Sequence, residues 1–330
     1  MPPSSPSDRA WREQMRRRFR TPAALLAAWG RAPARGEIET ARRYPVRVTP
    51  YYAGLMRRAD ARDPIFALCM AQPDELAETP GTAPDPFDEH GRMPLPGLIR
   101  RYADRAVLLA AADCPVYCRH CTRKHTIGRP APAWTARRLR ALADWLRRHP
   151  DVREALVSGG DPLTLSDDRL EDILRAVRSA GTVDILRLGT RAPVTLPQRI
   201  TPALCRLLRR YAPLWVNTHF NHPAELTPRA ARACERLVDA GIPVGNQTVL
   251  LRGVNDDPDT LETLFRGLVR IRVRPYYLLQ CDPVRGAGHF RVPLARGRRI
   301  ERTLRARLSG LAMPLYVADV PGASSKRPLC

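Results

Sequence analysis

Three cysteines lie close together in the segment CPVYCRHC, at positions Cys114, Cys118 and Cys121. Thiolates at this spacing are able to hold three irons of a [4Fe–4S] cube and leave the fourth iron without a protein ligand. A small molecule can chelate such an open iron and accept an electron there. A zinc site is the alternative, but it needs a fourth Cys or His, for which His125 is the nearby candidate. The spacing therefore favours an iron–sulfur cluster.

Lysine is rare in this chain, and its rarity draws attention to one position. Of the 55 basic residues, Lys124 and Lys326 are lysines and all the others are arginines. A primary amine can lose its proton and form an imine with an aldehyde, which a guanidinium cannot do. Lys326 lies in the small-residue turn DVPGASSK, which suits an amine that reaches a cofactor from a loop. The alternative is a solvated residue near the C-terminus.

Short apolar runs alternate with amphipathic, arginine-rich segments from about residue 105 onward. The alternation predicts a parallel α/β sheet. The predicted strands are 106–112, 154–158, 184–188, 214–218, 243–250, 274–279 and 314–319, and the predicted helices are 134–148, 167–180, 200–211, 227–240, 258–270 and 295–309. About six strand–helix units are fewer than the eight of a closed barrel. We therefore predict an α/β fold of the partial, open (β/α)6 type.

Polar residues follow the predicted strands at the points where the strands end. In parallel barrels, the carboxyl ends of the strands carry the chemistry. These residues are the three cysteines, Ser158 to Asp161, Thr190-Arg191, Asn217 to His219, Asn246-Gln247, Gln280 to Asp282, and Asp319 with Lys326. Each has a structural reading as well, such as a tight turn for Gly159-Gly160. Their shared position nevertheless predicts one site.

The first hundred residues have a different pattern. Trp11, Met15, Phe19, Leu25 and Leu26 recur at near-helical spacing and predict a helix over 8–30. Residues 31–100 are mixed and become rich in Pro and Gly around 80–97. We therefore divide the chain into an N-terminal helical or irregular lead-in (1–100), a partial barrel (101–312) and a C-terminal lysine segment (313–330).

Several segments together resemble the lysine 2,3-aminomutase family of radical S-adenosylmethionine (SAM) enzymes, and the resemblance covers the predicted barrel and the lead-in helix. The segments that carry it are RYADR (101–105), CPVYCRHCTRKH (114–125), VSGGDPL (157–163), RLGTRAPVTLPQRIT (187–201), WVNTHFNHPAE (215–225), NQTVLLRGVND (246–256), YYLLQCDPVRGAGHFRVP (276–293) and ADVPGASSK (318–326).

The resemblance implies a role for each matching position. It implies that Cys114, Cys118 and Cys121 bind the [4Fe–4S] cluster and that SAM chelates the open iron. It further implies that His120 touches the adenine of SAM and that the turn Gly159-Gly160-Asp161 contacts its methionyl amino group. His219 and Gln247 are implied to lie near this cofactor. For the second cofactor, the resemblance implies that Lys326 holds pyridoxal 5′-phosphate (PLP) and that Arg101 and Arg105 bind its phosphate beside Tyr102. For the substrate, it implies that Arg123 binds the α-carboxylate and that Asp282 and Asp319 bind the ammonium at the end of the side chain.

The implied reaction is that of an isomerase. A 5′-deoxyadenosyl radical would take a hydrogen from lysine bound to PLP, and the α-amino group would move to the β-carbon to give β-lysine. Arginine remains a second candidate substrate, as does lysine destined for elongation factor P, whereas two acids would repel glutamate. Two readings from other classes also stay open, namely a radical SAM enzyme that modifies RNA and a non-catalytic iron–sulfur or zinc protein that binds nucleic acid.

The composition indicates which classes of partner and which cell compartment suit the protein. The formal net charge of +22 suits nucleic acid, but the arginines are spread over every segment, so nucleic-acid binding is disfavoured. Apolar runs are much shorter than the ~20 residues of a membrane span. Eight scattered cysteines and a cluster that needs free thiols predict the cytoplasm. A radical SAM reaction also needs an external electron donor of the flavodoxin or ferredoxin type. The sequence ends soon after Lys326, so we expect the oligomer contacts of longer members to differ, and a homo-oligomer stays open.

Overall fold

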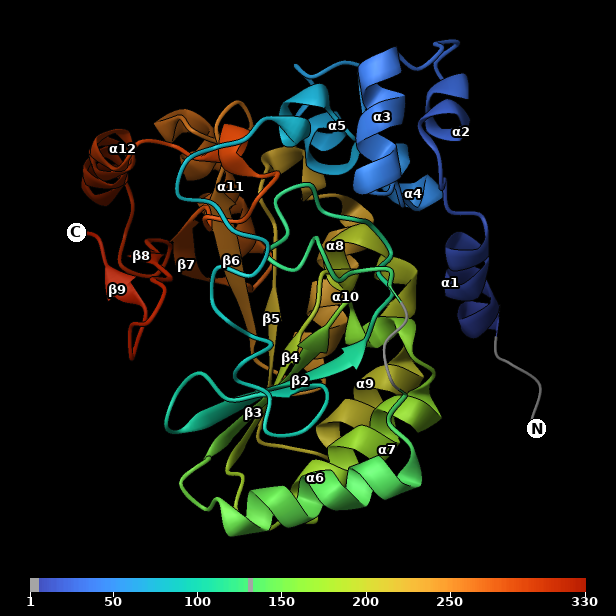
Figure 1. Cartoon of the computed structure of the whole chain (residues 1–330), viewed down its shortest axis with the longest axis vertical. Helices are drawn as coiled ribbons and strands as arrows, with labels where there is room; N and C mark the ends of the chain where they lie inside the picture. The colour runs from blue at the N-terminus through green and yellow to red at the C-terminus, as the bar shows by residue number, and fades with distance from the viewer. Residues whose placement is uncertain (1–5, 130–132) are drawn as a thin grey trace.

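One open sheet organises the protein in the computed structural model, which describes residues 6–129 and 133–330 (Figure 1). The strands stand side by side in chain order from β1 to β9, and the sheet does not close on itself. β2 to β8 run parallel, whereas β1 and β9 pair antiparallel with the two edges. The strands are β1 (Leu98–Ile99), β2 (Arg105–Ala111), β3 (Glu154–Gly159), β4 (Ile185–Gly189), β5 (Leu214–Thr218), β6 (Val244–Leu250), β7 (Arg274–Gln280), β8 (Leu315–Ala318) and β9 (Arg327–Pro328).

Helices connect the parallel strands and cover the outside of the sheet (Figure 1). They are α6 (Ala136–Arg148), α7 (Asp167–Arg178), α8 (Ala192–Thr195), α9 (Pro202–Arg209), α10 (Pro228–Asp239), α11 (Pro258–Arg270) and α12 (Leu294–Arg307). The predicted strand–helix alternation and the partial, open barrel are confirmed. The short helix α8 lies in the β4–α9 connection and was not predicted.

Local sequence explains where these helices begin. The side chain of Thr201 accepts a hydrogen bond from the backbone of Leu204 and caps α9. Thr227 caps α10 and Asp257 caps α11 in the same way. In all three helices, a proline follows the cap, where its missing N–H leaves no intrahelical bond unmade.

The lead-in differs from the prediction. Residues 8–30 do not form one helix: α1 (Pro6–Arg16) ends before α2 (Pro22–Ala27) begins. Thr21 is extended and caps α2, and a proline follows it, so the first helix cannot continue. Between the helices, Phe19 exchanges backbone hydrogen bonds of 2.8 and 3.1 Å with Val48. Periodicity alone therefore misread a helix–bridge–helix unit.

The lead-in continues across one end of the barrel and shares its core. Its remaining helices are α3 (Arg35–Arg43), α4 (Pro50–Ala53), α5 (Pro64–Cys69) and the 3-10 turn η1 (Pro73–Leu76). Trp11, Leu25 and Tyr52 belong to the same buried cluster as Leu108 of β2. The lead-in thus packs on the barrel through apolar burial. Over the described ranges, no helix combines the length and the apolar character that crossing a bilayer requires.

Candidate active site

Two adjoining cavities open at the carboxyl ends of the parallel strands, and they share Glu89, Arg101, Arg123, Asp319 and Lys326 among their lining residues. Every site residue predicted from the sequence lines one or both of them. The first cavity contains Cys114, Cys118, His120, Cys121, Gly159, Gly160, Asp161, His219 and Asp282, the second contains Tyr102 and Arg105, and both contain Gln247 and the shared residues.

The three clustered cysteines follow β2 and face the first cavity. Burial raises the pKa of Cys114, and it raises the pKa of Cys121 to about 12. Thiols in such surroundings lose their protons when iron replaces them. Within residues 6–129 and 133–330, no three His, Cys, Asp or Glu side chains are arranged to hold a single metal ion. The free thiols, their soft-ligand chemistry and the adjoining cavity fit a cluster with an open iron.

A buried ion-pair triad holds the cysteine loop from within. The guanidinium of Arg119 donates to both oxygens of Glu75 at 2.9 and 2.7 Å. The ammonium of Lys124 donates to the same carboxylate at 2.9 Å and to the carbonyls of Arg119 and Gly286. All three charged side chains are completely buried. The compact ammonium with three donors explains why position 124 carries a lysine.

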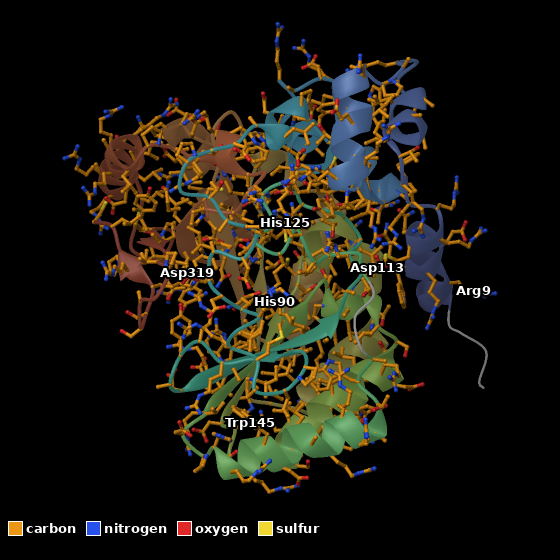
Figure 2. All side chains as sticks on the ribbon, viewed as in Figure 1. Arg9, His90, Asp113, His125, Trp145 and Asp319 are labelled. Atoms are coloured by element: carbon orange, nitrogen blue, oxygen red, sulfur yellow. The ribbon has the colours of Figure 1, made fainter. Side chains whose placement is uncertain are left out.

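Asp113 fixes the start of the same loop to the lead-in. Its carboxylate accepts two hydrogen bonds of 2.8 Å from Arg18 and one of 2.7 Å from Arg47. Arg18 also donates to the carbonyl of Cys114 at 2.6 Å. Figure 2 labels Asp113 on the lead-in side of the molecule, away from Asp319. The lead-in therefore helps to position the first predicted cluster ligand.

The turn Gly159-Gly160-Asp161 packs against the chain just before the cysteines. A Cβ atom on Gly159 would come within 2.6 Å of the carbonyl oxygen of Ala111, and one on Gly160 within 2.4 Å of that of Asp113. Gly159 also has a φ of +119°, which L side chains rarely adopt. The glycines are thus required for close approach of the two segments, and they still line the cavity.

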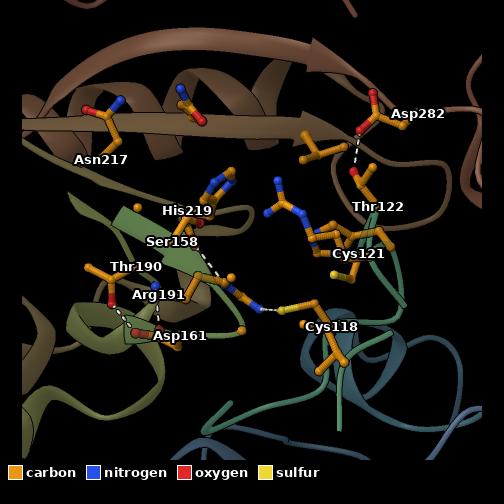
Figure 3. A pocket seen from close by; sticks show the side chains of 18 of the residues that line it. Cys118, Cys121, Thr122, Ser158, Asp161, Thr190, Arg191, Asn217, His219 and Asp282 are labelled. Carbon is orange, nitrogen blue, oxygen red and sulfur yellow. Dashed lines mark hydrogen bonds between the residues drawn. The ribbon is translucent and has the colours of Figure 1, made fainter. Parts of the chain in front are cut away.

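The carboxylate of Asp161 is occupied within the protein. It accepts hydrogen bonds from the hydroxyl of Thr190 at 2.6 Å and the backbone of Arg191 at 2.9 Å (Figure 3). The backbone of Leu163 donates a third, at 3.0 Å. Burial raises its pKa above the ordinary value. Asp161 therefore joins the ends of β3 and β4 and shapes the cavity wall through them.

Arg191 is a charged neighbour of the cysteines to which the sequence assigned no role. Its Nη1 donates to Sγ of Cys118 at 2.8 Å (Figure 3). Its other nitrogens donate to Tyr52 at 3.1 Å, to the carbonyl of His219 at 3.0 Å and to the buried carboxylate of Glu225. Arg191 thereby ties the cysteine loop to the buried end of β4. Its place after a predicted strand marked it for the site, but nothing in the sequence indicated a contact with a cysteine.

Two neutral imidazoles face the first cavity. Burial, and then the nearby charge of Arg191, lowers the pKa of His120 well below its usual value and that of His219 to about 4. Nδ1 of His120 is buried and has no hydrogen-bond partner in the described structure. An orphaned ring nitrogen that faces a cavity fits a nucleobase edge, which SAM provides.

The amine of Lys326 reaches both cavities from the C-terminal turn. β9 pairs with β8 directly after it, with Arg327 opposite Ala318 and Pro328 opposite Val317. Nζ donates to Asp319, which also accepts from Arg101 at 2.8 Å. Although burial opposes it, these two cations hold the pKa of Asp319 below its ordinary value.

The second cavity has the groups that an aldehyde cofactor with a phosphate needs. The hydroxyl of Tyr102 donates to Asp319 at 3.0 Å, and the guanidiniums of Arg101 and Arg105 lie 5.3 and 4.9 Å from the ring centre of Tyr102. Lys326 supplies the amine. One amine, two guanidiniums and an aromatic ring within one cavity fit PLP.

Asp282 is the second acidic group near the amine. It follows β7 and accepts a hydrogen bond from the hydroxyl of Thr122 (Figure 3). Burial, followed by the charge of Asp319, raises its pKa to about 6, while Lys326 and Arg101 oppose the rise. Asp282 and Asp319 therefore form an acidic pair in which Asp319 has most of the cationic partners.

Arg123 has an unexpected acidic partner. Its Nε and Nη2 donate to the two carboxylate oxygens of Glu89, each at 2.7 Å. Glu89 lies in the Pro- and Gly-rich part of the lead-in, and no periodic signal marked it. The predicted carboxylate-binding arginine is thus already engaged on one side.

Comparisons with known proteins agree with this geometry. The model of the Radical SAM superfamily matches residues 110–264. A curated L-lysine 2,3-aminomutase from Fusobacterium nucleatum is 45% identical over 294 residues, covering 89% of this chain and 69% of that protein. One from Clostridium subterminale is 42% identical over 321 residues, covering 97% and 77%.

Two further comparisons bear on substrate and fold. A glutamate 2,3-aminomutase from Clostridioides difficile is 41% identical over 282 residues, covering 86% of this chain and 67% of that protein. The solved structure of Streptococcus suis SuiB bound to the precursor peptide SuiA has a TM-score of 0.50 and 13% identity, covering 67% of this chain and 50% of that chain. The latter likeness concerns the fold alone.

Proposed function

The chain belongs to the lysine 2,3-aminomutase family of radical SAM enzymes, and from that premise we propose that it converts L-lysine to β-lysine. Enzymes of this family are isomerases that use a [4Fe–4S] cluster, SAM and PLP, and the two cavities offer groups that fit all three. Together these cofactors supply the radical that removes a hydrogen and the conjugated system through which the nitrogen migrates.

The observation that carries the choice of substrate is the acidic pair. Asp282 and Asp319 line the cavity that Lys326 enters. Burial raises the pKa of Asp282 to about 6, whereas Lys326 and Arg101 lower that of Asp319 against the effect of burial. A distal ammonium would compensate both carboxylates, whereas a third carboxylate would be repelled. Because the lysine-specific and glutamate-specific relatives are similarly identical to this chain, this pair discriminates better than overall identity does.

The chain's own residues then bind and orient the substrate. Arg123 binds the α-carboxylate, and Asp282 with Asp319 binds the side-chain ammonium, so the amino acid is held at both ends. Holding both ends fixes which carbon faces the cluster side of the cavity. Lys326 holds the cofactor covalently between turnovers, and Asp319 orients its amine.

The cluster side has complementary tasks. Cys114, Cys118 and Cys121 bind the cluster, and Arg191 orients Cys118 through its hydrogen bond to Sγ. His120 and His219 stay neutral, so they accept or donate hydrogen bonds to SAM without adding charge. The lead-in covers this end of the barrel and excludes water from it.

We place the enzyme in the cytoplasm because all eight cysteines are free and the cluster ligands must stay reduced. An electron donor of the flavodoxin or ferredoxin type would reduce the cluster, and the state of association, monomer or homo-oligomer, is to be measured by light scattering.

The test is anaerobic reconstitution with iron, sulfide, a chemical reductant, SAM and PLP, followed by a panel of L-lysine, L-arginine and L-glutamate. We expect β-lysine by NMR from L-lysine and little turnover of L-glutamate. β-Arginine as the main product would move the assignment to the guanidinium substrate. Product from L-glutamate alone would contradict the role of the acidic pair.

A further inference from the structure

The segment formed by residues 83–92, which we call the strap, crosses the mouth of the barrel. The backbone of Ala83 accepts a hydrogen bond from Arg285 at 2.9 Å and donates to Pro283 at 3.0 Å, in the loop that follows Asp282. Phe87 and Glu89 of the strap line the first cavity. The strap is therefore a wall of the active site contributed by the lead-in.

The strap holds its shape through its own side chains. The carboxylate of Asp85 accepts hydrogen bonds from the backbone of Glu89 at 2.9 Å and of His90 at 3.1 Å, and it contacts the His90 ring at 2.8 Å. These bonds fix the backbone of Glu89, whose side chain is mostly buried. Figure 2 labels His90 near the middle of the view.

Two arginines that face the cavities rest on this strap. The guanidinium of Arg101 lies 4.2 Å from the ring centre of the buried Phe87. The guanidinium of Arg123 forms the paired hydrogen bonds with Glu89. One short segment thus orients both the predicted phosphate-binding and the predicted carboxylate-binding cation.

The geometry of the Arg123 pair leaves one side of the guanidinium available. Glu89 occupies Nε and Nη2, which form the lateral edge of the planar group. Within the described residues, Nη1 of Arg123 makes no hydrogen bond. Since a guanidinium has five N–H donors, Nη1 and the second N–H of Nη2 form another edge that matches a carboxylate.

We propose that Glu89 is a positioning residue that locks Arg123 edge-on, so that its free edge receives the α-carboxylate of the amino acid. The inference rests on the proposed function and deepens it. Without Glu89, the long arginine side chain would have to be ordered by the substrate itself, which weakens binding. The competing reading, in which Glu89 fills the place of the substrate, predicts the opposite effect of its removal.

The test compares two ligands on the PLP-loaded protein, L-lysine and 1,5-diaminopentane, which has both amines but no carboxylate. Dissociation constants come from the change in pyridoxal absorbance. We expect Glu89→Gln to weaken L-lysine binding roughly tenfold, as for loss of hydrogen bonds to a charged group. Binding of the diamine should change less than about twofold, and Glu89→Asp should recover part of the loss.

Glu154→Gln is the matched control. Glu154 also lines the second cavity and pairs with an arginine, Arg187, at 2.9 Å, but it does not contact Arg123. The ratio of the two dissociation constants should stay near the wild-type ratio in this variant. Iron content and circular dichroism of each variant report whether it is folded.

The outcomes distinguish a failure of the proposed role of Arg123 from a failure of the proposed role of Glu89. If wild-type protein binds L-lysine no more tightly than the diamine, the α-carboxylate contributes nothing to binding, and the proposed role of Arg123 is wrong. If the wild type prefers L-lysine and Glu89→Gln keeps that preference, or strengthens it, the inference about Glu89 is wrong and the proposed function stands.

Discussion

The cysteine loop and the lysine turn bring reactive groups to the same cavities, but the protein holds them very differently. Around the cysteines, Arg119 and Lys124 are completely buried with Glu75, and Arg191 contacts Cys118 directly. In the lysine turn, most residues from Pro321 onward are exposed, and 27% of the Lys326 side chain remains accessible.

The contrast matches two different tasks. In the proposed function, the three cysteines would have to hold a cluster in one place, and buried, fully paired charges keep their loop in one arrangement. In the proposed function, Lys326 would hold PLP, and its amine would have to move as the amino acid binds and leaves. A turn held chiefly by β9 and Asp319 can make that movement at low cost.

The largest effects on turnover should come from variants that remove either the lysine amine or one of the cysteine thiols. Lys326→Ala should lower turnover of L-lysine on the order of a thousandfold or more, because the covalent cofactor link is lost. Its iron content should stay at the wild-type level. Cys118→Ser should instead lose iron and activity together while PLP still binds, as measured by absorbance. Iron loss in Lys326→Ala would show that the two regions are not independent.

The next largest effect tests the rigidity of the cysteine loop. Glu75→Gln leaves Arg119 and Lys124 without their shared counter-charge in the interior, and we expect it to lower the free energy of unfolding by about 3–5 kcal/mol. Arg147→Ala, which removes an exposed pair with Asp144 on α6, should cost less than about 1 kcal/mol. Thermal and urea unfolding measure both. Equal effects would contradict the distinction between buried and exposed pairs.

A moderate effect should appear in the pH dependence of lysine binding. Because the pKa of Asp282 is raised to about 6, this carboxylate is charged at pH 7.5 and mostly protonated at pH 5.5. Asp319, whose pKa is lowered, stays charged over this range, and His219, with a pKa of about 4, stays neutral. Affinity for L-lysine should therefore fall about fourfold on acidification.

The control for this pH effect is a ligand without the distal charge. L-Norleucine should bind with little change between pH 7.5 and pH 5.5, and Asp282→Asn should remove the dependence for L-lysine. The surrounding cations Lys326, Arg101 and Arg123 are present in every arm. A steep loss of L-norleucine binding at low pH would assign the titration to another group.

The smallest effect is expected from a variant that removes one hydrogen bond between the lysine turn and α12. The guanidinium of Arg298 donates to the carbonyl of Leu329 at 2.9 Å, next to β9. Arg298→Ala should weaken retention of PLP about two- to fivefold, since one hydrogen bond that orders the turn is lost. Arg302→Ala, on the same helix, is the comparison, and dialysis followed by absorbance measures retention. Loss of iron in Arg298→Ala would contradict a local effect.

Local patterns predicted the framework well. Short apolar runs between amphipathic segments predicted β2 and the parallel strands that follow it. The spacing of Cys114, Cys118 and Cys121 and the rarity of lysine pointed to four residues that line the two adjoining cavities. The chemical roles of these residues stay predictions. The helix over 8–30 was wrong because the extended bridge at Phe19 depends on Val48, a distant partner that periodicity does not register.

Ion pairs between residues far apart in the sequence could not be predicted for the same reason. Glu75 and Glu89 have no periodic or motif signal in a chain with 55 basic and 33 acidic residues, and the strand-end position of Arg191 does not reveal its contact with Cys118. Which acid meets which arginine is decided by the fold, since the contact of Glu89 with Arg123 requires the strap to cross the barrel mouth. Sequence patterns located the reactive groups, and the structure identified what orients them.

The attachment of the strap also has a consequence for the order of assembly during synthesis. Ala83 leaves the ribosome long before Pro283 and Arg285, its hydrogen-bonding partners. The wall over the barrel mouth therefore cannot settle until Pro283 and Arg285 have emerged, long after the strap itself. Until then Glu89 has no fixed position from which to orient Arg123.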